Sequence, residues 1–244
     1  MRFPVAVWAA GLLLLAPPVS AETFSPAQKA EIVAILRDAL KQDPTILRDA
    51  VAALQNDDGE QEKAVSRAAI ADAKAALIAV DDPIAGNPRG GVTIVEFFDV
   101  RCSYCKKLEP AMMALLAGDR DVRLIYKDLP ILGPPSVLGS KAAMAAQKQN
   151  AYEKMREAMM KLPPDITRVA IEAEARKLGL DAARLLHDMD DPSIQARIDA
   201  NLKLAQQLSI QGTPAMVIGG ELLPGAVDAA ELKRAVAEAR ASGR

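Results

Sequence analysis

The segment that most constrains this chain is Val92–Phe98, a run rich in β-branched and aromatic residues that follows the pair Gly90–Gly91. Such a run predicts a strand that is buried on both faces of a sheet. A helix is expected from about Cys102 to Ala117, and a second strand at Val122–Lys127, where apolar and polar residues alternate. A strand, a helix and a strand in this order predict a parallel pair with a right-handed crossover.

The residues after this unit predict a helical insert and an antiparallel hairpin. Helical patterns extend from about Ser136 to Ser209, with breaks at asparagine, glycine and proline residues. A short strand at Pro214–Ile218 is followed by the tight turn Gly219–Gly220 and a partner strand at Glu221–Leu223, and Asp228 caps a last helix. The predicted fold class is therefore α/β, with a mixed central sheet that a helical subdomain interrupts.

Helices are also expected before the sheet. Ser25–Pro26 is a helix cap followed by a first-turn proline, and Asp43–Pro44 starts a second helix. We expect a turn at Asn56–Gly59, an alanine-rich helix from Glu60 to about Val80, and a linker at residues 81–88. The apolar stripes of these helices can pack on the chain's own domain or on other copies of the chain. We favour the second, because short amphipathic helices outside a core need a surface that buries their apolar faces.

The first 21 residues have the pattern of a secretory signal peptide. Met1–Arg2 supplies a positive charge, Val5–Ala16 is an apolar run, and small residues precede a cleavage position after Ala21. The apolar run has about twelve residues, whereas a membrane-spanning helix needs roughly twenty. We therefore expect an exported protein in a periplasmic, oxidising compartment, where paired cysteines form bridges or do redox work.

Composition excludes several other classes of function. The formal net charge is −2 and aromatic residues make up 3% of the chain, which argues against nucleic-acid binding. His187 is the single histidine, so a metal site with several histidines is excluded, and we expect it to be an ordinary structural or surface residue. The nine methionines offer soft ligands for copper, but at helical spacing they are expected to fill the core.

The chemistry is concentrated in Cys102 and Cys105, the only cysteines of the chain. At the start of a helix, unpaired N–H groups and the helix dipole favour the thiolate of Cys102. Cys105 lies one turn further on, where it can resolve a mixed disulfide. A tetrahedral zinc site needs four ligands, and the chain has no second pair. A redox-active pair and a plain structural bridge both remain, and the strand–helix context favours the redox pair.

Four features together resemble the DsbA-like branch of the thioredoxin superfamily. They are the run from Phe97 to Cys105, the acidic residue Glu96 on the preceding strand, the segment Gly212–Thr213–Pro214, and the helical insert. The N-terminal helices further resemble those of ScsC-type and Com1-like exported thiol-disulfide oxidoreductases. In such relatives an N-terminal extension can drive self-association, which resembles how the DsbC and DsbG isomerases become dimers.

This resemblance implies a role for each residue of the motif. Cys102 is the nucleophile and Cys105 the resolving thiol, while Glu96 assists proton transfer. Thr213 and Pro214 form a substrate platform if their peptide bond is cis. Ser103 and Tyr104 tune the cysteine pair or contact the substrate. They match neither the pair of strong oxidases nor the pairs of isomerase-like members, and without a histidine they imply a milder oxidant, whereas Thr213 resembles the isomerase side of the family. No cofactor and no metal are implied.

The expected domains are a signal peptide at residues 1–21, a helical arm at 22–88, and a DsbA-like thioredoxin domain at 89–244 with its insert at about 130–210. We expect a homo-oligomer formed through residues 22–80. The implied partners are unfolded or misoxidised exported proteins and a membrane redox partner, either DsbD/ScsB-like or DsbB-like. The expected function is that of a thiol-disulfide oxidoreductase with isomerase or reductase bias. The alternative is a Cu(I)-binding copper-tolerance protein that uses the two thiolates.

Overall fold

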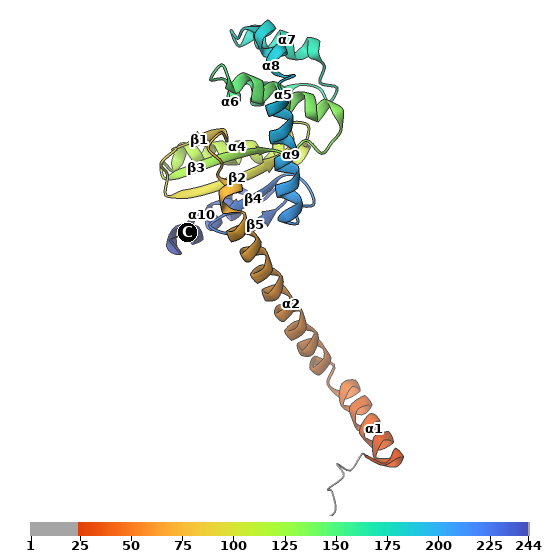
Figure 1. Ribbon diagram of the computed structural model, residues 1–244. Coiled ribbons are helices and arrows are strands. Elements are labelled where there is room, and N and C mark those ends of the chain that lie inside the picture. The colour runs from red at the N-terminus through yellow and green to blue at the C-terminus, as the bar shows by residue number, and fades with distance from the viewer. Residues whose placement is uncertain (1–23, 244) are drawn as a thin grey trace, which may run out of the picture. The chain divides into compact units, whose positions relative to one another are not determined.

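The computed structural model describes residues 24–243, apart from the side chain of Asp58 (Figure 1). The expected signal peptide at residues 1–21 lies outside the described residues. The chain divides into two compact units, with the boundary between Asp57 and Asp58.

The first unit is helical. Helix α1 (Pro26–Gln42) starts with a capping box, in which the Ser25 hydroxyl accepts a bond from the Gln28 amide and the Gln28 side chain accepts one from the Ser25 amide. Helix α2 (Thr45–Asp72) begins in this unit. The expected turn at Asn56–Gly59 is wrong, because α2 continues through these residues. One glycine costs a helix only about 1 kcal/mol, which the helix-forming residues on both sides outweigh.

The second unit contains a five-stranded mixed sheet, which confirms the predicted fold class. Its strands are β1 (Ile84–Gly86), β2 (Val92–Phe98), β3 (Val122–Asp128), β4 (Ala215–Ile218) and β5 (Glu221–Pro224). The spatial order is β1-β3-β2-β4-β5, and only the central pair of β2 with β3 is parallel. Gly219 and Gly220 both have positive φ angles, 57° and 85°, as a two-residue turn between β4 and β5 requires.

Two expectations for the segment before the sheet are corrected. The region expected to be a linker contains β1, which pairs with β3 at the edge of the sheet. Three residues are too few to give a sequence pattern, because the partner strand supplies the hydrogen bonds that define this edge. The helix expected from Glu60 to Val80 ends at Asp72, and the one-turn helix α3 (Lys74–Leu77) follows it.

The helices of the second unit follow the predicted order. They are α4 (Ser103–Gly118), α5 (Pro134–Gln147), α6 (Tyr152–Lys161), α7 (Arg168–Lys177), α8 (Ala182–Asp188), α9 (Pro192–Gln207) and α10 (Ala229–Ala241). Figure 1 shows α5–α8 gathered beyond one end of the sheet, with α9 leading back along it. Helices α5–α9 lie between β3 and β4 in the sequence, so they form the expected insert.

Successive side chains of β2 point to opposite faces of the sheet and pack into two different cores. Ile94 and Phe98 belong to the core that also contains Cys105, together with residues of α4, the insert and α10. Val95 and Phe97 belong to the core on the opposite face, with residues of α2, α3 and α9. Because side chains alternate along a strand, Glu96 lies on the same face as Phe98 and therefore as Cys105.

A buried ion pair fixes α3 and the start of β1 against the sheet. The Lys127 ammonium on β3 donates to a carboxylate oxygen of Asp82 at 2.5 Å and to the carbonyl oxygen of Ala76 at 2.7 Å. Both charged side chains are almost fully buried, with 2% and 7% exposure. Neither charge can therefore lose its partner without leaving the other one unpaired in the core.

Replacing Asp82 with alanine is expected to lower the free energy of unfolding by about 3 kcal/mol, because the Lys127 ammonium is left buried without a counter-ion. Urea unfolding at pH 7 measures the change. The control is Asp81→Ala, since the neighbouring Asp81 is exposed and should change stability by less than about 0.5 kcal/mol. Equal effects of the two substitutions would contradict the role given to the ion pair.

Candidate active site

Cys102 occupies the N-cap position of α4, directly after the loop that leaves β2. Its amide donates to the Asp99 carbonyl at 3.0 Å, and its carbonyl accepts the Lys106 amide at 3.1 Å. The cysteine therefore lies where the first N–H groups of the helix have no partner within the helix. Cys102 is 6% exposed and Cys105 is fully buried, and the two are not joined by a disulfide here.

The buried carboxylate of Asp99 holds the loop between β2 and α4. One of its oxygens accepts the Arg101 amide at 2.8 Å, and the other accepts the Leu132 amide at 3.0 Å. The Arg101 guanidinium donates to the Leu132 carbonyl. The loop that carries Cys102 is thereby tied to the loop after β3, and both loops lie at the same end of the parallel strand pair.

The segment before β4 supplies the other side of the site. The Thr213–Pro214 peptide bond is cis, the geometry that the resemblance implied. The Cys102 thiol donates to the Thr213 carbonyl oxygen at 3.2 Å. The antiparallel pairing of β2 with β4 brings these residues together although they are 111 positions apart in the sequence.

Glu96 and Cys105 form the buried side of the site. Burial raises the pKa of the Cys105 thiol, and the nearby charges of Cys102 and Glu96 raise it further. Burial also raises the pKa of Glu96, to about 7, while the Arg156 charge opposes this shift and Glu109 adds to it. One carboxylate oxygen of Glu96 is buried without a hydrogen-bond partner. A carboxyl group that titrates near neutral pH can accept or give a proton.

Ser103 and Tyr104 are exposed on the first turn of α4. The Tyr104 ring is 58% exposed, and the Lys107 ammonium lies 5.2 Å from its centroid. These two residues thus lie beside Cys102 on the solvent side, whereas Cys105 and Glu96 lie beneath it.

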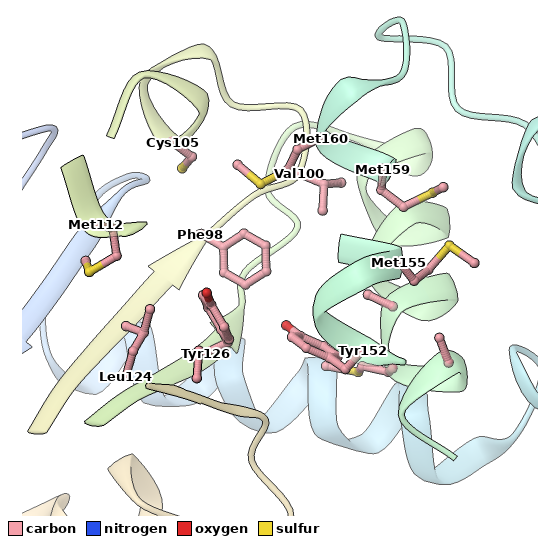
Figure 2. Packing of buried hydrophobic residues seen from close by; sticks show 14 of the residues in the cluster. Phe98, Val100, Cys105, Met112, Leu124, Tyr126, Tyr152, Met155, Met159 and Met160 are labelled. Atoms are coloured by element: carbon pink, nitrogen blue, oxygen red, sulfur yellow. The ribbon is translucent and has the colours of Figure 1, made fainter. Parts of the chain in front are cut away.

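The other candidates are a histidine in the insert and methionines in the core. His187 is on α8, inside the insert. Several methionines are buried in the core, and Figure 2 shows Met155, Met159 and Met160 beyond the Phe98 ring, with Met112 and Cys105 on its other side. Among residues 24–243, no cluster of three or more histidine, cysteine, aspartate or glutamate side chains could hold a metal ion.

The sequence interpretation missed a buried arginine next to the site. Arg156 on α6 is fully buried and donates both terminal nitrogens to the carboxylate of Glu109 on α4. It also donates to the Tyr126 hydroxyl at 3.1 Å. A signal was present, since the buried residues of α6 follow the helical spacing i, i+3, i+4, i+7, i+8 and an arginine occupies one of these positions.

This geometry defines a class of protein: a thioredoxin fold with a helical insert, a Cys-x-x-Cys pair at the start of the first helix, and a cis-proline opposite the pair. Residues 93–237 match the family described as DSBA-like thioredoxin domain. The chain belongs to this family. Residues 28–61 match a second family, described as copper resistance protein ScsC N-terminal domain.

Individual relatives agree with this family. A crystal structure of Proteus mirabilis ScsC in a transitional conformation is 31% identical, with a TM-score of 0.65, over 90% of this chain and 98% of that one. The thiol:disulfide interchange protein DsbA of Bordetella parapertussis is 25% identical over 59% of this chain and 71% of its own length. The protein shares with these relatives the domain type that carries thiol-disulfide exchange.

A third relative is much longer than this chain. The Na(+)/H(+) antiporter NhaA 3 of Salinispora tropica is 30% identical over 67% of this chain and 25% of its own length. The chain thus spans about a quarter of the length of this curated relative. In the part of the chain that the structure describes, no helix combines the length and the apolar character needed to cross a membrane.

The raised pKa of Glu96 predicts a pH-dependent stability. The pKa lies near 7 in the folded protein, against an ordinary value of 4.5, so the folded state holds this proton more tightly than the unfolded chain. The stability that this proton provides is complete below about pH 4.5 and is lost as the pH rises through 7. The Glu96→Gln substitution removes this loss of stability at high pH. At pH 8 the free energy of unfolding of the variant should exceed that of the wild type by about 3 kcal/mol.

Urea unfolding at pH 4, 6 and 8 measures this difference between the Glu96→Gln variant and the wild type. The control is Glu157→Gln, a half-exposed carboxylate on α6, which should follow the wild type at each pH. A Glu96→Gln variant whose stability stays parallel to the wild type across the range would show that Glu96 titrates as an ordinary carboxylate.

Proposed function

We propose that the protein is an exported thiol-disulfide oxidoreductase that exchanges the Cys102–Cys105 pair with client proteins. The observation that carries this proposal is the position of the Cys102 sulfur, at the N-terminus of α4 and 3.2 Å from the Thr213 carbonyl oxygen. An extended client segment can pair with the backbone of Thr213 and thereby present its own sulfur to Cys102. The match to the DSBA-like family supports the same activity.

The exchange proceeds in two steps that balance in atoms and electrons. The Cys102 thiolate attacks a client disulfide, one client sulfur leaves as a thiolate, and a mixed disulfide between Cys102 and the client forms. Cys105 then gives its proton to the Glu96 carboxylate and attacks the Cys102 sulfur. The client leaves as a dithiol, and the protein retains a Cys102–Cys105 disulfide. The reverse sequence donates the disulfide to a reduced client.

We assign the protein an isomerase or reductase bias. Thr213 before the cis-proline supports this direction, since it resembles the isomerase side of the family. The Ser103–Tyr104 pair has no histidine between the cysteines, which favours a milder oxidant. In this direction the Cys102–Cys105 pair must be re-reduced after each net reduction. A DsbD/ScsB-like membrane reductase supplies these electrons in the proposal, whereas a DsbB-like oxidase would make the protein a disulfide donor. The signal-peptide pattern of residues 1–21 supports a periplasmic location.

Cysteine variants test the activity directly. Cys102→Ala should abolish reactivation of scrambled ribonuclease, because no sulfur remains that can attack the client disulfide. Cys105→Ala should accumulate the mixed disulfide, which appears on a non-reducing gel as a covalent adduct with the client. Ser193→Ala is the control, since this exposed residue on the first turn of α9 has no part in the proposed site and the variant keeps both sulfurs. Full isomerase activity in Cys102→Ala would remove the proposal.

We further propose that the N-terminal helices join copies of this chain. Helix α1 has no buried residue, and large apolar side chains of α1 and of the first part of α2 are exposed. They are Ile32, Val33, Ile35, Leu36, Ile46, Leu47, Val51 and Leu54. Apolar surface on this scale indicates a partner that covers it. The match of residues 28–61 to the ScsC N-terminal domain supports a shared use of this segment.

Deleting residues 22–57 is expected to convert an oligomer into a monomer and to reduce isomerase activity more than dithiol oxidation. The deletion must end before the rest of α2, because Ile70 is part of the buried core of the second unit. Sedimentation equilibrium gives the assembly state, and Glu31→Gln on α1 is the control for a change that leaves the apolar residues in place. A mature full-length chain that sediments as a monomer would contradict the oligomer.

The alternative function is Cu(I) binding by the two thiolates. The description of the matched N-terminal family as a copper resistance protein domain is the observation that favours it. Anaerobic titration with Cu(I) in competition with a chromophoric chelator distinguishes the two functions. Tight 1:1 binding without disulfide exchange would support copper binding, whereas exchange that persists with the chelator present supports the oxidoreductase.

A further inference from the structure

Strand register places Glu96 next to a tyrosine that a buried arginine covers. Glu96 on β2 and Tyr126 on β3 are paired neighbours in the parallel ladder, so their side chains lie side by side on one face of the sheet. The Arg156 guanidinium is 4.3 Å from the centroid of the Tyr126 ring and donates to its hydroxyl at 3.1 Å. A buried positive charge from the insert therefore lies beside the carboxyl group of Glu96.

Arg156 is fixed in this position by several elements. Both terminal nitrogens bind the carboxylate of Glu109, and one of them also contacts the Met160 sulfur at 3.0 Å. The Phe98 ring centroid lies 5.4 Å from the guanidinium carbon. A fully buried guanidinium that forms a bidentate ion pair with a carboxylate has a single orientation and keeps its charge.

Glu109 connects this buried pair to solvent and to the active helix. It lies four residues after Cys105 on α4, and its side chain is 19% exposed. Glu109 and Met160 also line a surface cavity of about 280 Å³ between α4 and α6. The ion pair thus spans the distance from this cavity to the buried face of the sheet on which Glu96 lies.

The groups that face Glu96 come from three elements. They are the Arg156 guanidinium on α6, the Glu109 carboxylate and the Cys105 thiol on α4, and the Tyr126 hydroxyl on β3. Among these groups, only Arg156 carries a positive charge. Arg156 favours the ionised form of Glu96, and the negative charge of Glu109 disfavours it. The charge state of Glu96 therefore depends on the opposing effects of Arg156 and Glu109, which also bind each other.

We propose that the Glu109–Arg156 ion pair is a positioning device of the active site, which sets how readily Glu96 accepts the proton of Cys105. The inference rests on the proposed function and deepens it, since it gives the helical insert a part in resolving the mixed disulfide. Arg156 keeps Glu96 available as a carboxylate near neutral pH, and Glu109 limits this effect. Neither residue touches the reacting sulfurs.

The test measures resolution of a preformed mixed disulfide between the full chain and a thiol-containing peptide, in single turnover from pH 5 to 9. Cys105 loses its proton to Glu96 and attacks Cys102, and the peptide thiolate released is counted. In the wild type the rate should rise with pH as Glu96 becomes ionised. Glu109→Gln should move this rise to lower pH, because a negative charge near Glu96 is removed.

Arg156→Met should move the rise to higher pH by roughly one pH unit, which corresponds to about ten-fold slower resolution at pH 5 and about five-fold slower resolution near pH 7. Arg156→Lys keeps the positive charge and should restore a profile close to that of the wild type. Glu157→Gln is the matched control, because Glu157 lines the same cavity and should leave the profile unchanged. Thermal unfolding followed by circular dichroism shows whether Arg156→Met folds. If this variant does not fold, the pH profile of Glu109→Gln alone tests the proposal.

Two kinds of failure are distinguishable. If the wild type resolves the mixed disulfide and the Glu109→Gln profile coincides with it, the inference is wrong while the proposed function stands. A uniform slowing of Arg156→Met at every pH would likewise overturn the inference, because a merely structural role predicts it. If the wild type forms no mixed disulfide through Cys102, the proposed function itself fails.

Discussion

The structure depends on the two-sided pairing of β2. Its parallel partner β3 and its antiparallel partner β4 bring together three segments that are far apart in the sequence. The loop after β2 carries Cys102, the loop after β3 binds Asp99 through Leu132, and the segment before β4 carries the Thr213 carbonyl. The contact between the Cys102 sulfur and this carbonyl is therefore a consequence of the register between β2 and β4.

The two cysteines differ in how deeply α4 buries them. The N-cap position places Cys102 at the surface end of α4, next to exposed Ser103 and Tyr104. One turn later the helix turns Cys105 onto the buried face of the sheet, beside Glu96. Burial makes ionisation unfavourable for Cys105, so a nearby proton acceptor is needed before this sulfur can attack. In the proposed exchange this acceptor is Glu96, which the alternation of β2 places on the same face.

The helical insert also places a charged side chain in the core beside the sheet. Its helix α6 directs Arg156 into the core, where two aromatic rings and the Glu109 carboxylate hold the charge. Met155, Met159 and Met160 of the same helix are buried on the insert side of the Phe98 ring (Figure 2), and the Met160 sulfur contacts the guanidinium. Flexible methionine side chains fill irregular core space. The insert and the sheet thus share one continuous core.

The sequence by itself determined the α/β class, the strands and helices around the motif, and the position of the cysteine pair, because these features follow from local patterns of apolar residues, caps and turn residues. The sequence wrongly predicted a turn at Asn56–Gly59, because a small balance of helix propensities decides whether a helix continues through these residues. It also missed β1, because that strand depends on hydrogen bonds from a partner strand. Only the tertiary structure decided the contact of Cys102 with Thr213, the depth of Glu96 and the burial of Arg156. These depend on which distant segments meet, and burial changes the free energy of a charge far more than any local preference does.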